Sequence, residues 1–429
     1  MIALLQRLFP PLTTDLREAL TPLFVVFAFA LGAASGSFLN VVIWRLPRGE
    51  CLSRPPSHCP RCQARIRAWQ NLPLLSWIML RGRCFNCHLP ISLRYPLIEL
   101  IGALLFSALW WWSTAPTQVW LAFFPHALFL SLLLACAMTD WDHGIIPDRL
   151  TRLGILAALL CAAAWPRLQP VPEALLAGGA PGESLITAAL LNQFPLLQKT
   201  GPHGIAALHC LLGVLAGAAL LGGFRLAANL LLGSVRPDAD PGALPGEFSL
   251  TPAGLGPRPP DPAAPPVPLD RLLPADADYV RLDLRQARLL RPDGPATGER
   301  LPRRLLLFRE GVETSSGQFL PWNDTWEVTG TLRGFSARRD TVGLGDVKLL
   351  AMIGAFLGPD ACIYVLLLAA LPAALAGLLI LAVPPLRRAA DSASLRFGPW
   401  LALAATSLFF FGNHLVLWFR NVILSLLLR

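Results

Sequence analysis

Two groups of acidic residues in this chain lie where apolar segments end. The first group belongs to the sequence Thr139-Asp-Trp-Asp-His-Gly-Ile-Ile-Pro-Asp148, and the second to Gly343-Leu-Gly-Asp-Val-Lys348. A carboxyl group at the end of an apolar helix is costly unless it faces protein or a water-filled cavity, so such residues are functional candidates. We therefore identify Asp140 and Asp346 as candidate catalytic residues.

Two carboxyl groups brought together at one depth can perform acid–base chemistry. Burial and mutual repulsion prevent both from ionising easily, so one keeps its proton while the other is charged. The charged carboxylate takes a proton from water, and the protonated one polarises the peptide carbonyl that is to be cut. This is the chemistry of an aspartic peptidase, which needs neither a metal nor a covalent nucleophile.

Residues beside the two aspartates are candidates for supporting roles. Gly343 and Gly345 allow a positive φ angle or a close approach of substrate to the backbone. Asp142 is either a helper or a solvated loop acid, and Asp148 either supports the site or caps the helix that follows it. Lys348 completes this set of supporting candidates.

Four of the nine cysteines form a second constellation. Cys59-Pro-Arg-Cys62 is followed by Cys84-Phe-Asn-Cys87. Each pair supplies two thiolates from one tight turn, and two pairs close a tetrahedral zinc site. A loop with little apolar core of its own would gain folding free energy from such a metal. A redox dithiol pair and unpaired cysteines remain alternatives, and the flanking His58 and His88 are not needed as ligands.

The composition is that of a helical membrane protein. Of the 429 residues, 54% are hydrophobic and 15% are charged, and the mean hydropathy is +0.53. Soluble domains carry about 25% charged residues. The net charge of +9 is typical of basic loops that face anionic lipid headgroups, so we expect a lipid bilayer, and no nucleic acid, as the partner.

Apolar runs predict an all-α polytopic protein with about eight transmembrane helices, because about 20 apolar residues cross a bilayer. The runs cover residues 21–43, 95–113, 118–139, 149–165, 203–224, 347–358, 361–383 and 398–418. We expect the first run to be a retained helix, because prolines and acids precede it and no small-residue cleavage site follows at a suitable distance.

The distribution of arginine predicts the orientation of these helices. The segment 44–94 contains nine arginines and a single acid, Glu50. The positive-inside rule places this segment in the cytoplasm. The loop 384–397, with Arg387, Arg388 and Arg396, falls on the same side when eight helices are counted. Both aspartate motifs are therefore expected at the cytoplasmic face, and both chain termini on the opposite side.

Two long connections do not fit a bare helical bundle. Residues 237–274 are rich in proline and read as an extended linker. Segments 279–284, 304–308 and 325–329 carry β-forming residues, which predict a small β-rich cytoplasmic insert. The expected organisation is an N-terminal segment with the first helix (1–43), a cytoplasmic cysteine loop (44–94), three helices with the first aspartate motif (95–165), an external loop (166–202), the fifth helix (203–235), the linker and insert (236–340), and the Gly-x-Gly-Asp motif with the last three helices (341–429).

In this order the motifs resemble those of the type IV prepilin peptidase and N-methyltransferase family, bacterial members of the G-x-G-D aspartic peptidases. The other matching motifs are Gly36-Ser-Phe-Leu-Asn-Val-Val-Ile-Trp-Arg-Leu-Pro47, Asn71–Trp77, Arg81–Cys84, Ile91–Glu99 and Phe397-Gly-Pro399. The segments 166–202 and 236–340 depart from the family, whose members are usually shorter.

The resemblance implies an enzyme of the bacterial inner membrane with its active site facing the cytoplasm. The implied reaction is cleavage of the basic leader of type IV prepilins or type II secretion pseudopilins after a Gly, with Asp140 and Asp346 as the catalytic pair. It also implies N-methylation of the new N-terminal residue with S-adenosylmethionine, and it associates the cysteine loop with methylation and zinc. No residue is assigned to the methyl donor.

Three other hypotheses stay open. A transporter that uses its acids as a proton relay would need no cysteine loop, and no inverted repeat is visible in the sequence. A thiol–disulfide oxidoreductase should carry its cysteines on the oxidising side, whereas the arginines place them in the cytoplasm. A peptidase that has lost methylation would not need all four cysteines. Within the family hypothesis, Asp142 and Asp148 are candidates for attracting a basic leader.

Overall fold

We describe the protein from a computed structural model. It describes residues 14–113, 123–164, 185–193, 200–232, 247–252, 254–257, 267, 279–290, 299–301, 303–308, 311–314, 319–322, 325–338, 343–382 and 396–427. The chain divides into two compact units. One comprises Met1–Leu221 with Leu344–Arg429 and is helical, and the other, Gly222–Gly343, holds the β-strands.

Each of the eight predicted apolar runs coincides with a helix, apart from Gly358, the last residue of one run, and apart from residues 118–122, 165 and 383, which lie outside the described part of the chain. These helices are α2 (Thr14–Arg45), α4 (Arg94–Ser113), α5 (Phe123–His143), α6 (Asp148–Ala164), α10 (Gly201–Leu232), α12 (Leu344–Leu357), α13 (Pro359–Ala382) and α15 (Gly398–Leu427). Among the described residues, five helical stretches are long and apolar enough to cross a membrane: Thr21–Arg45, Arg94–Trp112, Phe123–His143, Gly201–Leu230 and Pro359–Ile380. Helices α6 and α12 have only 17 and 14 residues, so the count of eight spans stays a prediction.

Shorter elements lie between these helices. The cysteine loop contains η1 (Ala68–Asn71) and α3 (Leu75–Met79). The segment predicted as an external loop contains α8 (Leu185–Gln193), and most of its other residues lie outside the described part of the chain. Helix α10 continues to Leu232, beyond the predicted end at 224, because residues 225–232 are mostly apolar and include no proline.

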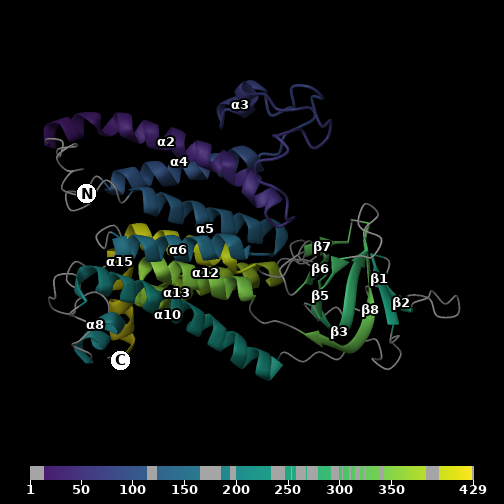
Figure 1. Ribbon diagram of the computed structural model, residues 1–429. Helices are drawn as coiled ribbons and strands as arrows, with labels where there is room; N and C mark the ends of the chain where they lie inside the picture. The colour runs from purple at the N-terminus through teal and green to yellow at the C-terminus, as the bar shows by residue number, and fades with distance from the viewer. Residues whose placement is uncertain are drawn as a thin grey trace. The chain divides into compact units, whose positions relative to one another are not determined.

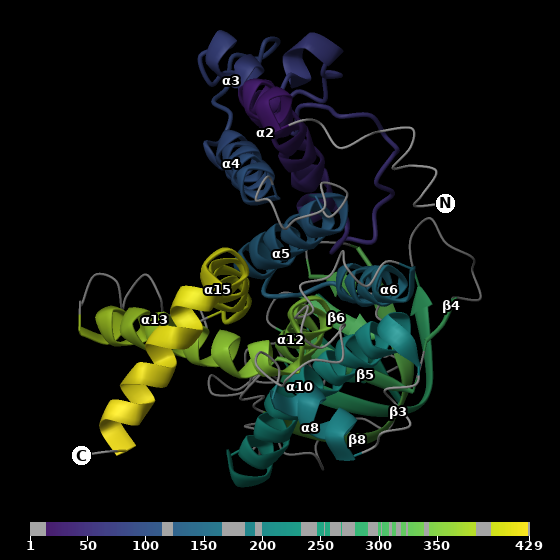
Figure 2. The ribbon, with the colours of Figure 1, turned by 90° about the vertical axis from the view of Figure 1, so that its left-hand side faces the viewer.

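Helices α2 and α4 cross at very close range. A β-carbon on Gly32 would lie 2.3 Å from the carbonyl oxygen of Gly102, and one on Gly36 would lie 2.7 Å from the Cα of Glu99. Small residues four apart let two membrane helices pack backbone to backbone. This contact anchors the α2–α4 pair, which Figures 1 and 2 show beside α5.

The short helix α12 is surrounded by other helices of the same unit. It packs against α10, where a β-carbon on Gly213 would lie 1.8 Å from the carbonyl oxygen of Gly354. It contacts α5 through the stacked rings of Phe129 and Phe356, whose centroids are 4.4 Å apart. It also contacts α6, α13 and α15. A helix enclosed in this way can hold a polar residue away from lipid.

The β-rich insert exists, as predicted, and forms one antiparallel sheet. Its strands run in the order β2-β1-β8-β3-β5-β6-β7, with β4 paired to β3. The bounds are β1 Glu247–Thr251, β2 Gly254–Pro257, β3 Tyr279–Leu290, β4 Glu299–Arg300, β5 Arg304–Phe308, β6 Gly311–Thr314, β7 Phe319–Pro321 and β8 Glu327–Arg338. The long strands β3 and β8 lie side by side (Figure 1). Alternate residues of the strands are buried in a shared core that includes Phe248, Val280, Leu282 and Trp326.

Candidate active site

Asp140 lies in the last turn of α5 and is buried, with 7% of its surface exposed. The backbone N–H of Gly398, the first residue of α15, donates a 3.0 Å hydrogen bond to its Oδ2. A hydrogen bond from a backbone N–H to a buried carboxylate is charge-assisted and fixes its orientation. Two helices far apart in the sequence therefore meet at this carboxyl group.

Only a glycine fits at position 398 in this arrangement. A β-carbon there would lie 2.6 Å from Asp140 Oδ2 and 3.1 Å from Cδ1 of Ile146. Arg396 lies two residues earlier, and its guanidinium interacts electrostatically with Asp140. In the sequence, Gly398 belongs to the motif Phe397-Gly-Pro399 and Arg396 to the basic loop 384–397, but neither pattern predicts that Gly398 or Arg396 lies at the site.

Asp346 lies in the first turn of α12 and is also buried, with 9% of its surface exposed. The N-terminus of a helix favours negative charge, because the backbone N–H groups there point along the axis. The neighbouring Gly345 packs against Ile146, whose Cβ would be 2.9 Å from a β-carbon on that glycine. Since Ile146 also contacts Gly398, this one side chain links the surroundings of the two aspartates.

The packing of α5 against α12 places the two aspartates at a similar height. Asp140 lies eleven residues after Phe129, and Asp346 lies ten residues before that ring's stacking partner, Phe356. With a rise of 1.5 Å per residue, both positions are about 15–17 Å along their helices from the stacked rings, and the two helices run antiparallel. The two carboxyl groups are thus at the same end of the helical unit.

Asp148 and Lys348 join the two aspartate motifs. The Lys348 ammonium donates to Asp148 Oδ1 at 2.5 Å, and Arg152 donates to Asp148 Oδ2 at 2.8 Å. The Lys348 and Asp148 side chains are 41% and 37% exposed. A partly exposed ion pair contributes up to about 1 kcal/mol to the stability of the fold. The main effect of this pair is therefore to fix the position of α6 along α12.

Asp142 is paired within the helical unit as well. Its carboxylate accepts a hydrogen bond from Arg94 at the start of α4, and both side chains are about a fifth to a quarter exposed. The supporting acids Asp142 and Asp148 therefore both have internal cationic partners, so neither presents an uncompensated negative charge to a basic leader.

The glycines of the Gly-x-Gly-Asp motif do not have the positive φ angle that was one of the two expectations for them, and the close approach of a substrate to their backbone stays a prediction. Neither Gly343 nor Gly345 is among the described residues with positive φ. Gly343 is exposed, and Gly345 is required by the packing against Ile146. A positive φ, +67°, is found instead at Gly144, in the turn between Asp142 and Asp148 of the first motif. There the chain leaves α5, and the N–H of Gly144 donates to the carbonyl of Asp140.

The four predicted cysteines come together. The ligand atoms of Cys59, Cys62, Cys84 and Cys87 all lie within 4.8 Å of one another, and the Sγ atoms of Cys59 and Cys87 are 3.9 Å apart. Zinc–sulfur bonds of about 2.3 Å in a tetrahedron would separate the sulfurs by about 3.8 Å. The cluster thus has the dimensions of a zinc site, whereas a disulfide would need about 2.0 Å between its sulfurs.

The two halves of the cluster have the same backbone geometry. The N–H of Gln63 donates to the carbonyl of Cys59, and the N–H of His88 donates to that of Cys84, each at 2.9 Å. Gln63 and His88 follow the second cysteine of each pair and have φ angles of +59° and +57°. The two C-x-x-C turns therefore have the same conformation, and each contributes two sulfurs to the cluster. The flanking His58 and His88 do not belong to the cluster.

Hydrogen bonds prepare part of the cluster to bind a cation. The backbone N–H of Ala64 and the amide of Asn86 donate to Cys62 and lower the pKa of its thiol to about 6. Although the N–H of Leu89 acts in the opposite direction, burial and the neighbouring sulfurs raise the pKa of Cys87 to about 11. Four thiolates so close together repel one another, and a bound cation relieves that repulsion.

These features define a multi-helix membrane protein with two buried aspartates at one end of its helices and a four-cysteine cluster in a loop. Residues 30–113 match the Bacterial Peptidase A24 N-terminal domain, and residues 315–378 match the Type IV leader peptidase family. The second match contains Asp346, and the first contains the cysteine cluster. Asp140 lies outside both matched segments.

Curated relatives agree with these matches. A prepilin leader peptidase/N-methyltransferase of Pseudomonas putida is 35% identical over 251 residues, which cover 53% of this chain and 81% of the relative. One of Myxococcus xanthus (strain DK1622) is 45% identical over 33% of this chain and 41% of the relative. The chain belongs to the prepilin leader peptidase/N-methyltransferase family.

The extent of these matches is uneven. A type 4 prepilin-like proteins leader peptide-processing enzyme of Escherichia coli O78:H11 (strain H10407 / ETEC) is 42% identical over 34% of this chain and 59% of the relative. The chain thus spans about half the length of the first relatives that it matches. No solved structure matches the chain.

Proposed function

We propose that this protein is a membrane aspartic endopeptidase that cleaves the basic leader of type IV prepilins or pseudopilins and then methylates the new N-terminal residue. The observation that carries the proposal is the burial of Asp140 and Asp346 at one end of the helices, joined through Ile146 and Gly398. Family membership supports the same reaction.

In this proposal the two carboxyl groups share one proton. The charged carboxylate takes a proton from a water molecule, and the protonated carboxyl donates a hydrogen bond to the scissile carbonyl. Gly398 keeps Asp140 in place, and the Lys348–Asp148 pair keeps α12 in register with α6. Leader removal frees an amine, which gains a methyl group and loses a proton in the second reaction.

Zinc fits the cluster of Cys59, Cys62, Cys84 and Cys87, which would hold it as a structural ion that shapes the loop. S-adenosylmethionine is the proposed methyl donor. We further propose that about eight helices span the inner membrane with segment 44–94 and the active site facing the cytoplasm, as its arginines favour. The same topology puts the β-rich insert in the cytoplasm.

Co-expression of the full-length protein with a prepilin tests this function. Intact-mass measurement should find a shortened pilin that is heavier by one methyl substitution, about 14 Da, than the unmodified cleaved chain. Pilin that keeps its leader in the presence of the protein would contradict the peptidase assignment. A trimmed pilin without the added mass would contradict methylation alone.

A further inference from the structure

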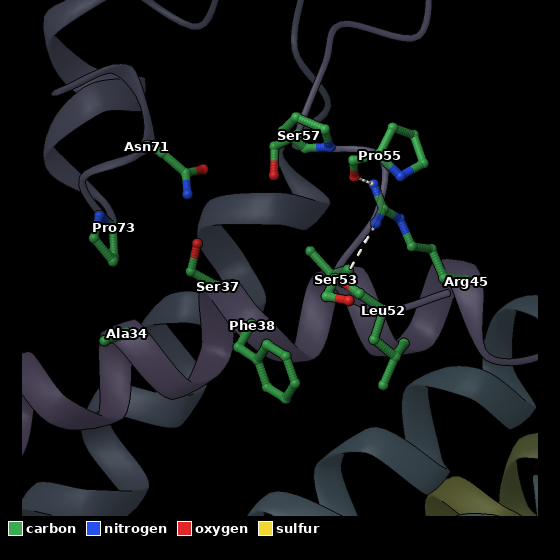
Figure 3. Close-up of a pocket in the computed structure, with 12 residues that line it drawn as sticks. Ala34, Ser37, Phe38, Arg45, Leu52, Ser53, Pro55, Ser57, Asn71 and Pro73 are labelled. Carbon is green, nitrogen blue, oxygen red and sulfur yellow. Dashed lines mark hydrogen bonds between the residues drawn. The ribbon is translucent and has the colours of Figure 1, made fainter. Parts of the chain in front are cut away.

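A cavity lies between α2 and the beginning of the cysteine loop, separate from the two aspartates. It measures about 400 Å³ and is bounded by α2 on one side and by residues 52–57, Asn71 and Pro73 on the other (Figure 3). Pockets for small molecules have volumes of about 300–1,000 Å³. The cavity is therefore large enough for a cofactor.

One face of α2 forms the wall of this cavity. Ser37, Val41 and Arg45 are spaced by four residues, so they lie above one another on a single helix face. They belong to the motif Gly36–Pro47, which the proposed peptidase chemistry does not use. Another residue of this motif, Asn40, bonds to the carbonyl of Tyr95 and ties α2 to α4.

Arg45 places a buried positive charge in the cavity wall. Its residue is 7% exposed, and its guanidinium donates to the carbonyls of Cys51, Leu52 and Pro55 at 3.1, 3.3 and 2.7 Å. Within the described part of the chain, no carboxylate forms an ion pair with it. A buried charge held only by neutral groups gains stability from an anion, and a ligand carboxylate can supply one.

An acidic residue of α4, Glu99, lies next to Ser37, at the other end of the α2 face from Arg45. Glu99 on α4 accepts hydrogen bonds from Ser37, which lines the cavity, and from the N–H of Leu74 at 2.8 Å. Leu74 follows the lining residue Pro73 and has φ +62° and ψ −50°. Such strain in a residue with a side chain persists only where its surroundings enforce it, and it is common at ligand sites.

We propose that this cavity is the binding site of the methyl donor, S-adenosylmethionine. This inference rests on the methylation part of the proposed function. The donor carries a carboxylate that matches Arg45, which lines the cavity, and its positive charges are favoured by Glu99, which lies outside the cavity lining and accepts the hydrogen bond of Ser37. The ring of Phe38 and the side chain of Leu52 offer an apolar surface for its adenine, and Ser37 and Ser53 offer hydroxyl groups.

The test is the binding of S-adenosylhomocysteine, the unreactive product of the donor, to the purified full-length protein by calorimetry. Ala34→Trp places a large side chain in the cavity and should weaken binding at least about tenfold, a change in dissociation constant that calorimetry resolves. Leu31→Trp is the matched control, because this residue is on the same helix but does not line the cavity. Its affinity should equal that of the wild type.

A second variant tests the charge. Arg45→Gln should weaken binding, and zinc content with the thermal unfolding midpoint will show whether the loop is still folded. If the wild type and Ala34→Trp bind S-adenosylhomocysteine with equal affinity, the methyl donor does not bind in this cavity, although the proposed methylation function would still stand. A wild-type protein that trims and methylates prepilin but binds no S-adenosylhomocysteine would also overturn this proposal. Loss of methylation in the wild type would instead contradict the proposed function.

Discussion

The orientation of the Asp140 carboxyl group depends on Gly398, a residue without a side chain. Its Oδ2 is bound by the N–H of Gly398, a contact between positions 258 residues apart. The sequence indicated Asp140 and Asp346 because acids at the ends of apolar segments are rare. No local pattern could reveal this contact, since it arises only when α15 folds against α5.

Replacing Gly398 with alanine tests this dependence. The new β-carbon would lie 2.6 Å from Asp140 Oδ2, so the carboxylate must move. A misplacement of about 1 Å in a catalytic group can cost about 100-fold in rate, and leader cleavage should fall by that order. Gly412→Ala is the matched control on the same helix, because nothing lies within 4 Å of its added carbon. Equal cleavage rates in the two variants would contradict the positioning role of Gly398.

The four cysteines could be grouped from their spacing alone, because two C-x-x-C turns determine where four sulfurs can meet. What the spacing did not reveal is the positive φ at Gln63 and His88, which completes each turn. Glycine usually takes such a conformation, so neither residue signalled it.

Removal of one zinc ligand should release the metal. We expect Cys62→Ser to lose most of its zinc and to melt at a lower temperature, because metal binding contributes folding free energy to this loop. His88→Gln should keep its zinc, since His88 is outside the cluster. Elemental analysis of the two purified variants measures the zinc content per protein molecule. Full zinc occupancy in Cys62→Ser would argue against a four-cysteine site.

At the scale of elements, α12 is held by contacts that leave no room for side chains. A β-carbon on Gly354 would lie 2.1 Å from the carbonyl oxygen of Gly213 on α10 and 2.7 Å from the sulfur of Cys362. Apolar runs predicted where the helices are, and every predicted run is helical over nearly all of the residues that the structure describes. Their ends were less predictable, because α10 and α15 continue past the predicted limits where apolar residues persist.

Gly354→Val should therefore destabilise the helical unit. Overpacking costs about 1–3 kcal/mol even when the contact is with a side chain, and a rigid backbone carbonyl gives way less readily. We expect a lower unfolding midpoint in detergent. Gly377→Val on α13 is the control, since nothing lies within 4 Å of its added carbon. Similar midpoints for both variants would mean that α10 and α12 do not pack this closely.

At the scale of the whole molecule, the chain combines a helical unit with a β-rich unit that has its own core. The alternation of apolar residues in segment 279–284 and the β-forming residues of segment 304–308 predicted strands β3 and β5. The sheet order could not be predicted, because β1 and β3 both pair with β8, which follows them by many residues. Much of the proline-rich stretch 237–274 lies outside the described residues.

The β-rich unit should fold without the helices. Its fourteen-residue buried core includes Phe248, Leu305 and Val328, and a shared apolar core is the main source of stability for a small domain. A soluble fragment of residues 245–340 should show β-type circular dichroism and one cooperative thermal transition. A fragment that remains unfolded would mean that the helical unit is needed for its stability.

The most direct test of the central claim is leader cleavage by Asp140→Asn and Asp346→Asn, measured beside Asp142→Asn. Asparagine keeps the size of the side chain but cannot hold or transfer the proton, and loss of a catalytic acid or base costs about 100- to 10,000-fold. We predict that Asp140→Asn and Asp346→Asn both leave the prepilin intact. Asp142→Asn, which loses the ion pair with Arg94 but keeps both dyad aspartates, Asp140 and Asp346, should still cleave. Cleavage at the wild-type rate by Asp140→Asn or Asp346→Asn would show that the two aspartates are not the catalytic pair.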